Sequence, residues 1–168
     1  MIEGLSDSEI EHRLRAAAAQ RWQDLWDALD ALAVEPEMGR WAGGETVETI
    51  EVDGVDKPVI QMPYVIYGAA VFDVIAKVGA LGASQPFDWQ TWGGLNRYPN
   101  GRGLEEAPVA QSIWMITALV RADRFGEGTL LNSLMDGTFM AAVDRLRRWY
   151  EEQQLGGHGP DPDSGAKP

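Results

Sequence analysis

The stretch Ser112–Tyr150, SIWMITALVRADRFGEGTLLNSLMDGTFMAAVDRLRRWY, decides the fold of this chain. Its first part is apolar on nearly all sides between Ile113 and Val120, and a helix that is apolar all round is buried. The pattern therefore predicts a long buried helix over about 108–125. Gly126 follows it and is suited to a left-handed C-terminal cap.

Two further helices are predicted in the same stretch. Thr129 begins a short one that runs through Met135, and Gly137 closes it. Thr138 is a favourable N-cap residue for a last helix that extends to about Gln154.

The N-terminal third begins with a helix signal. Ser6 and Glu9 have the spacing of a capping box, in which each side chain pairs with a free backbone amide of the first turn. Apolar residues then recur at helical steps as far as Leu32, and Pro36 disfavours helical geometry in the residue before it. This pattern predicts one long helix that ends near Glu35.

A β-hairpin is predicted at about 45–62, where two runs rich in β-branched residues flank Asp53-Gly54. A two-residue loop places Glu51 opposite Asp56, so we expect a four-residue loop that avoids this pair of like charges. Because an isolated hairpin is marginally stable, we also expect it to pack on helices.

A second long helix is predicted over 64–81, after Pro63, whose missing amide is not needed in a first turn. Apolar residues surround most of it, so we expect it to be the central buried helix. A short helical turn over 86–92 and a glycine-rich loop over 93–103 follow.

These elements predict an α+β, mainly helical fold of about four to five helices with one small antiparallel β-hairpin. The length of 168 residues fits a single globular domain, which we assign to residues 1–155. Residues 156–168 are rich in Gly, Pro and Asp and contain no core-forming side chains, so we expect a disordered tail.

Composition limits where the protein acts. Cysteine is absent, which excludes a thiolate metal site and a cysteine nucleophile. The first ten residues lack the basic and apolar regions of a signal peptide. The longest apolar stretch, 65–78, is interrupted by charges and is shorter than the roughly 20 residues of a bilayer span. We expect a soluble, cytoplasmic protein that does not associate with membranes.

The net charge of −12 is unevenly distributed. Residues 1–56 hold fourteen Asp or Glu against four Arg, a balance of −10, whereas residues 97–149 hold seven Arg against six acids, a balance of +1. An acidic field repels phosphate backbones, so direct nucleic-acid binding is disfavoured and a basic partner is allowed.

Four charged residues gather where the predicted buried helix ends: Arg121, Asp123, Arg124 and Glu127. Guanidinium groups match a phosphate or carboxylate in two-pronged hydrogen bonds, and a neighbouring carboxylate can act as a base. The same groups can instead lock helices together at glycine turns, where backbone groups are unpaired. We favour the structural role and keep anion or nucleotide binding, or an enzymatic site, as the alternative.

Trp92, Arg97, Tyr98 and Arg102 form the second candidate binding site. Aromatic faces and guanidinium planes stack on bases or sugars, and a glycine-rich loop is a common place for binding residues. Tryptophans three residues apart, such as Trp89 and Trp92, are also typical core anchors, and we favour that interpretation for them.

Three motifs resemble a widespread bacterial and phage family that is classed as a domain of unknown function. They are Phe87-Asp88-Trp89-x-x-Trp92, Arg121-Ala-Asp123-Arg124-Phe125-x-x-Gly128-Thr129, and Asp136-Gly137 followed by Leu146. The resemblance covers about residues 60–150. It implies a shared fold and a prokaryotic or phage origin, and it brings no activity because the family has none established.

Conventional catalytic motifs are missing. His12 and His158 are the two imidazoles, one in an acidic helix and one in the tail, which disfavours a histidine triad or a zinc site. A nucleophile elbow, a phosphate loop and a dinucleotide fingerprint are absent from the sequence. We therefore expect no catalysis, no cofactor and no metal.

Residues 129–150 also have the outline of a helix-turn-helix, with Arg145, Arg147 and Arg148 on the second helix. The turn between the helices is shorter than the usual three to four residues. The second helix begins with Phe139 and Met140, where base-reading polar residues are expected. DNA binding is the third alternative.

We therefore expect a non-enzymatic intracellular binding or regulatory module that contacts a protein partner through the acidic first helix or the 93–103 loop. An acidic phage or mobile-element inhibitor that mimics nucleic acid is one version of this hypothesis. It requires the carboxylates of residues 1–56 to form a contiguous patch. The anion-binding alternative requires the cluster of residues 121–127 to meet in an open pocket.

Overall fold

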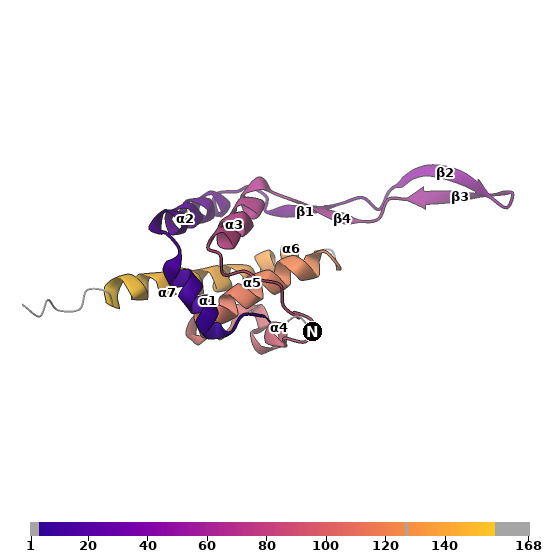
Figure 1. The fold of residues 1–168 in the computed structure, drawn as a ribbon. Helices are drawn as coiled ribbons and strands as arrows, with labels where there is room; N and C mark the ends of the chain where they lie inside the picture. The colour runs from indigo at the N-terminus through magenta and orange to yellow at the C-terminus, as the bar shows by residue number, and fades with distance from the viewer. Residues whose placement is uncertain (1–3, 127, 157–168) are drawn as a thin grey trace, which may run out of the picture.

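The computed structural model describes residues 4–126 and 128–156. A cluster of helices encloses the core, and a long antiparallel β arm, two strands wide, projects from one side of it (Figure 1). The mainly helical α+β class predicted from the sequence is confirmed.

Helix α5 (Val109–Asp123) lies at the centre of the core. Its residues are buried on all sides from Val109 to Leu119 apart from Thr117, which is partly exposed. Helices α1 (Asp7–Ala16), α6 (Thr129–Asp136) and α7 (Thr138–Gly156) pack against it. The helices predicted from the opening stretch are thus confirmed, with ends that differ by two residues or fewer.

The turn after α5 differs from the prediction. Gly126 is not among the residues with positive φ, whereas Gly128 is left-handed at +89° and precedes α6. Gly137 is left-handed as predicted and closes α6. At the start of α7, the Asp136 carboxylate accepts hydrogen bonds from the Thr138 amide at 2.9 Å and from the Thr138 hydroxyl at 2.6 Å.

The single long helix predicted from Ser6 is wrong, because it is divided into α1 and α2 (Ala19–Ala33). Ala17 and Ala18 are extended, with ψ of 131° and 143°. Alanine is the best helix former, so local preference does not explain the break. Packing does, since α1 lies against α5 while α2 lies against α3 (Ala69–Ala80).

Aromatic rings join α2 to α7. Trp22 is fully buried, and its ring stacks on Tyr150 with 4.8 Å between the centroids. The guanidinium of Arg147 lies over the ring of Trp26 at 4.9 Å. The last helix therefore closes the core against both α2 and α5.

Four strands form the arm, which we define as residues 39–67. They are β1 (Gly39–Ala42), β2 (Thr46–Val52), β3 (Val55–Ile60) and β4 (Tyr64–Tyr67), with β1 paired to β4 and β2 paired to β3, both antiparallel. The Gly44 amide donates to the Gln61 carbonyl at 2.7 Å and the Gln61 amide donates to the Glu45 carbonyl at 3.0 Å. These bonds join the two small sheets into one continuous ribbon.

The predicted helix over 64–81 is wrong in its first part. Residues 64–67 are a strand because they pair with Gly39–Ala42, a segment with no strand signature in the sequence. The helix begins at Ala69 and buries one face, so α5 rather than α3 is the central helix.

The predicted hairpin loop is also wrong. Glu51 lies opposite Asp56, and the loop has two residues, Asp53 and Gly54, with φ of 55° and 73°. Two left-handed residues form the turn whose twist matches the strands. Glu51 and Asp56 are exposed, where solvent and salt weaken their repulsion, so turn geometry decides the pairing.

The prediction that the hairpin packs on helices is wrong. Residues 46–51 are all exposed, and β2 and β3 extend beyond the helical body (Figure 1). The backbone ladder and its continuation into β1 and β4 hold this part of the arm in place.

The segment between α3 and α5 is irregular. The predicted helical turn over 86–92 is wrong, and the loop predicted over 93–103 contains α4 (Gly94–Arg97) and a short turn at Pro99–Gly101, before another turn at Leu104–Glu106. The Phe87 ring lies 4.4 Å from that of Trp114 and edge-on to Trp92 at 5.9 Å. These rings hold the segment against α5.

Buried apolar residues from α1, α2, α3, α5, α6 and α7 form one cluster, and the assignment of residues 1–155 to one domain stays a prediction. The predicted tail lies outside the described residues, except for Gly156, which ends α7. Within the described residues, no helix is both long enough and apolar enough to cross a membrane.

Gly128 allows a first test of the packing at the base of the arm. The ring of Trp41 on β1 occupies the space that a Gly128 Cβ would need, and φ is +89°. We expect Gly128→Ala to lower the free energy of unfolding by about 2 kcal/mol or more in urea titrations. Gly137→Ala is the matched control, because φ is +88° but no atom lies within 4 Å of the added Cβ. Equal losses in the two variants would contradict the Trp41 contact.

The first turn of α1 predicts a pH dependence. The Ser6 hydroxyl and then the Ser6 amide donate to the Glu9 carboxylate and hold the pKa of Glu9 below its ordinary value. The stabilisation is therefore present above the unfolded-state pKa and is lost as pH falls through the folded-state pKa. In NMR titrations, we expect Ser6→Ala to raise the pKa of Glu9 and Thr49→Ala, on the distant strand β2, to leave it unchanged. An unchanged pKa of Glu9 in Ser6→Ala would refute the capping contact.

Candidate functional site

The charged cluster at the end of α5 is divided between two faces. Arg121 and Arg124 are three residues apart and share one face of the helix, whereas Asp123 lies on another. Glu127 lies outside the described residues. Closeness in sequence therefore does not bring Asp123 together with the two arginines.

Asp123 holds the arm to the helices. Its Oδ1 accepts hydrogen bonds from the Tyr67 hydroxyl at 2.8 Å and from the Leu130 amide at 3.0 Å. The Tyr67 oxygen in turn accepts from the Leu131 amide at 3.1 Å. Amides in the first turn of a helix have no partner within that helix, so Asp123 and Tyr67 together cap α6. This is the structural role that we favoured for the cluster.

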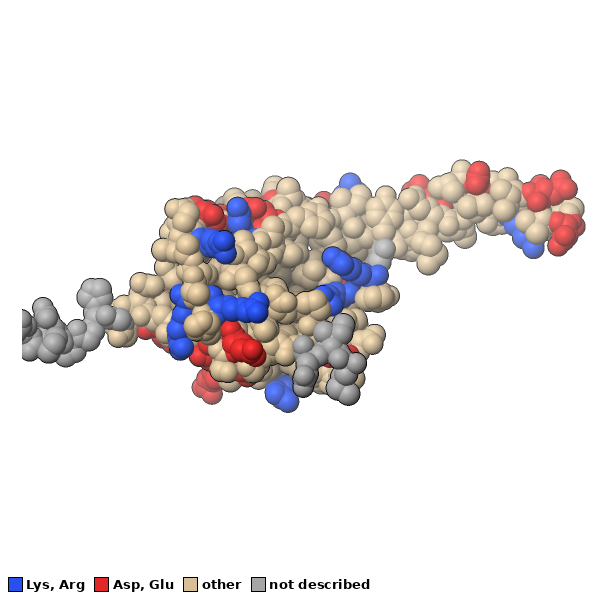
Figure 2. Space-filling model, in the orientation of Figure 1, with Lys and Arg blue, Asp and Glu red and all other residues tan. Residues whose placement is uncertain are grey.

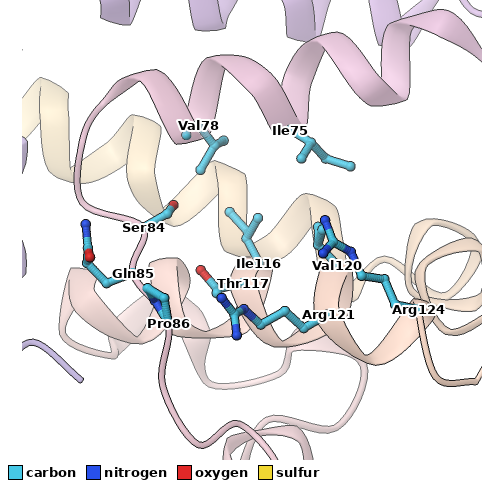
Figure 3. A pocket seen from close by; sticks show the side chains of 11 residues that line it. Ile75, Val78, Ser84, Gln85, Pro86, Ile116, Thr117, Val120, Arg121 and Arg124 are labelled. Carbon is cyan, nitrogen blue, oxygen red and sulfur yellow. The ribbon is translucent and has the colours of Figure 1, made fainter. Parts of the chain in front are cut away.

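Arg121 and Arg124 instead line a pocket between α3 and α5, which we call the α3–α5 pocket (Figure 3). Its volume is about 230 Å³. Ile75 and Val78 come from α3, and Ile116 and Val120 come from α5. Residues 84–86 close one side of it.

Three polar groups of this pocket have no partner in the described structure. Neither guanidinium of Arg121 and Arg124 forms a hydrogen bond or ion pair that involves residues 4–126 or 128–156. The Thr117 hydroxyl is buried and also lacks a hydrogen-bond partner there. In Figure 3 both arginine side chains extend back along α5 toward Val120 and Thr117.

The second predicted group of binding residues is dispersed. Trp92 and Arg97 line a separate pocket of about 390 Å³. Tyr98 is buried beside another hollow, while Arg102 is exposed and its Nε donates to the Pro99 carbonyl at 3.4 Å. The pocket of Trp92 also contains Asp7, whose oxygens accept from the Trp114 indole and the Gln111 amide, each at 3.3 Å.

The arginines of α7 bind neighbouring parts of the chain. Arg145 donates to the Ala107 carbonyl at 2.9 Å, and Arg148 donates to the Glu105 carbonyl at 3.2 Å. Thr138 and Phe139, at the start of this helix, are buried. The end of α7 that would have to enter a DNA groove is therefore covered by protein.

Metal ligation has no candidate in the described part of the chain, where no three His, Asp or Glu side chains gather suitably. Sequence reasoning missed Tyr67 and Thr117. Tyr67 was assigned to a helix, and its strand partner gives no signal. Thr117 lies in an apolar helix, and the sequence does not distinguish a threonine that lines a pocket from one that is simply buried in the core.

Asp123 gives a test of the contact at the base of the arm. Asp123→Ala leaves the Leu130 amide and the Tyr67 hydroxyl without their shared acceptor, so we expect a loss of about 2 kcal/mol in the free energy of unfolding. Asp123→Asn keeps an acceptor oxygen and should lose less. Chemical denaturation measures both variants, and Asp144→Ala, at an exposed position of α7, is the control. A loss no larger than that of the control would argue against the cap.

Comparison with known families places the chain. A model described as "Family of unknown function (DUF6508)" matches residues 17–152, a range that includes the arm and all the residues that line the α3–α5 pocket. No curated protein and no solved structure matches the chain. The match agrees with the predicted resemblance to an uncharacterised family. The chain therefore belongs to the DUF6508 family, whose function is unknown.

Proposed function

We propose that this protein is a non-enzymatic cytoplasmic module that binds another protein, and that the outer part of the arm, residues 43–62, makes the contact. The observation that supports this most directly is the exposed apolar face of the β2–β3 hairpin. Exposed apolar patches in a folded protein mark interaction sites.

The pairing of β2 and β3 places several apolar side chains on one face. Val52 lies opposite Val55, Ile50 lies opposite Lys57, and Val59 lies opposite Glu48. Residues at alternate positions of a strand point to the same side, so all four aliphatic residues share that face. Ile50 is 44% exposed and Val55 is 57% exposed. A partner that covers this face gains apolar burial that the described helices do not provide.

The backbone edges of the hairpin differ. Pro58 removes an amide donor from β3, which makes that edge a poor template for another strand. β2 contains no proline and keeps its donors. Addition of a partner strand along β2 is therefore the favoured backbone contact.

The charge of the arm indicates what surrounds the apolar contact. Residues 43–62 hold five Asp or Glu against one Lys, a balance of −4. Figure 2 shows acidic side chains gathered at the outer end of the arm. Such a surface attracts a partner with Lys or Arg around an apolar groove and repels a phosphate backbone.

The arm replaces the surfaces that we predicted for the contact. The 93–103 loop is folded into short turns that pack against α5 and α7. The carboxylates of the first third are spread over α1, α2, the connection to β1 and the hairpin, and the hairpin extends away from the helices (Figure 1), which counts against the contiguous patch that mimicry of nucleic acid requires. An inhibitor of that kind is not part of the proposal.

A non-enzymatic role is supported by the position of Asp123. Its carboxylate is engaged at the base of the arm, and no Asp or Glu is among the described residues that line the arginine pocket. DNA recognition by residues 129–150 is not proposed, because α7 begins with buried side chains.

The test compares apolar residues on and off the arm. The double variant Ile50→Thr, Val55→Thr keeps β-branched side chains, so the strands keep their conformational preference while the apolar area decreases. Val34→Thr is the matched control, because Val34 is 80% exposed at the end of α2. We expect captured partner to fall about tenfold or more with the double variant and to stay unchanged with the control.

The capture uses tagged protein and lysate of the native host, with a photo-reactive residue in place of Glu48, which shares the face of Ile50, to record contact with the arm. Circular dichroism checks that each variant is folded, and light scattering measures whether the partner is a second copy of the chain. Equal capture by the double variant and Val34→Thr would refute the role of the arm.

A further inference from the structure

The α3–α5 pocket combines an apolar wall with positive charge that has no partner among the described residues. Ile75 and Val78 face Ile116 and Val120 across it, and Arg121 and Arg124 lie at the end where α5 finishes. Guanidinium groups bind carboxylate and phosphate oxygens through paired hydrogen bonds. We propose that this pocket binds a small amphipathic anion, with a carboxylate or phosphate head on the two arginines and a short apolar body between α3 and α5.

The arginines of this pocket differ from most arginines in the described chain. Arg21 donates to the last carbonyl of α3 at 2.8 Å, Arg13 donates to a carbonyl two residues beyond it at 3.3 Å, and Arg145 donates to Ala107. Arg121 and Arg124 have no such partner among the described residues, and they carry like charges on one helix face. An anion between them relieves their repulsion and supplies the acceptors that they lack.

Thr117 gives a second, independent indication of a ligand. Its hydroxyl has almost no exposed surface and no hydrogen-bond partner among residues 4–126 and 128–156, although it lines the pocket one turn before Arg121. Buried hydroxyl groups in folded proteins are hydrogen-bonded in the great majority of cases. A ligand oxygen held by the arginines is suitably placed to accept from Thr117.

The size of the pocket limits the ligand. Its volume of about 230 Å³ is below the roughly 300–1,000 Å³ of pockets for drug-sized molecules. A nucleotide is therefore too large, and a single anionic group on a medium-length alkyl chain or a single ring fits better. The larger pocket beside Trp92 is less suited to an anion, because Asp7 and Asp88 line it together with Arg97.

Octanoate and octyl phosphate are the probes. Octanol and octylammonium are the controls that lack the anionic head, and inorganic phosphate is the control that lacks the apolar body. Calorimetry measures affinity, and amide NMR shifts at Thr117 and Val120 report the place of binding. We expect saturable binding of the two amphipathic anions at millimolar concentration or below. Octanol and inorganic phosphate should bind at least about tenfold more weakly, since each lacks one half of the recognised chemistry.

Matched variants distinguish binding in the pocket from a general effect of the protein's net charge. Arg121→Gln with Arg124→Gln should weaken octanoate binding about tenfold or more. Arg97→Gln with Arg102→Gln makes the same change in net charge at exposed positions outside the pocket and should leave binding unchanged. Arg124→Gln alone, at an exposed position, is the fallback if the first pair does not fold.

Thr117→Val distinguishes a ligand contact from a packing role. It removes the unpaired hydroxyl with little change of shape, so we expect a free protein that is no less stable but binds octanoate several-fold more weakly. Unchanged affinity in this variant would remove Thr117 from the site.

Three outcomes would overturn the proposal. They are equal affinity for octanol and octanoate, equal affinity for inorganic phosphate and octyl phosphate, and equal losses in the two arginine pairs. Absence of saturable binding by either amphipathic anion would overturn it as well. None of these results bears on the arm, whose residues are unchanged in every variant.

Discussion

Burial of α5 is the constraint on which the rest of this structure depends. A helix that is apolar on nearly all sides must be covered on nearly all sides, and α1, α6, α7 and the turns that follow α3 supply that cover. The break between α1 and α2 has the same origin. One straight helix cannot follow α5 and α3 together, so the chain gives up helical hydrogen bonds at Ala17 and Ala18 to cover both.

Where α5 ends, helical geometry directs the side chains of neighbouring residues to different parts of the structure. Asp123 points to the base of the arm and to the first turn of α6, while Arg121 and Arg124 point to the α3–α5 pocket. The sequence motif that contains all three therefore joins two separate sites. The effect of a substitution at one of these positions therefore reports on the contacts of that face of the helix and not on the whole motif.

Local signals in the sequence predict the elements whose stability is local. The capping box at Ser6, the buried helix, the two helices around Gly137 and the Asp53-Gly54 hairpin follow from neighbouring residues. Elements fixed by distant contacts are not predicted, and β4 is the clearest case because its partner, Gly39–Ala42, carries no strand pattern. Of the candidate site, the cationic residues are visible in the sequence, but their separation from Asp123 and the contribution of Thr117 require the three-dimensional packing.

The arm is tied to the helical body at its base, by Tyr67 and Asp123 and by Trp41 on Gly128. Its outer residues contribute nothing to the core, so insertions, deletions or exchanges there leave the hydrophobic core intact. About twenty residues of the arm can therefore change in sequence without loss of core packing. For the protein engineer the same separation makes the helical body a carrier onto which foreign hairpins can be grafted.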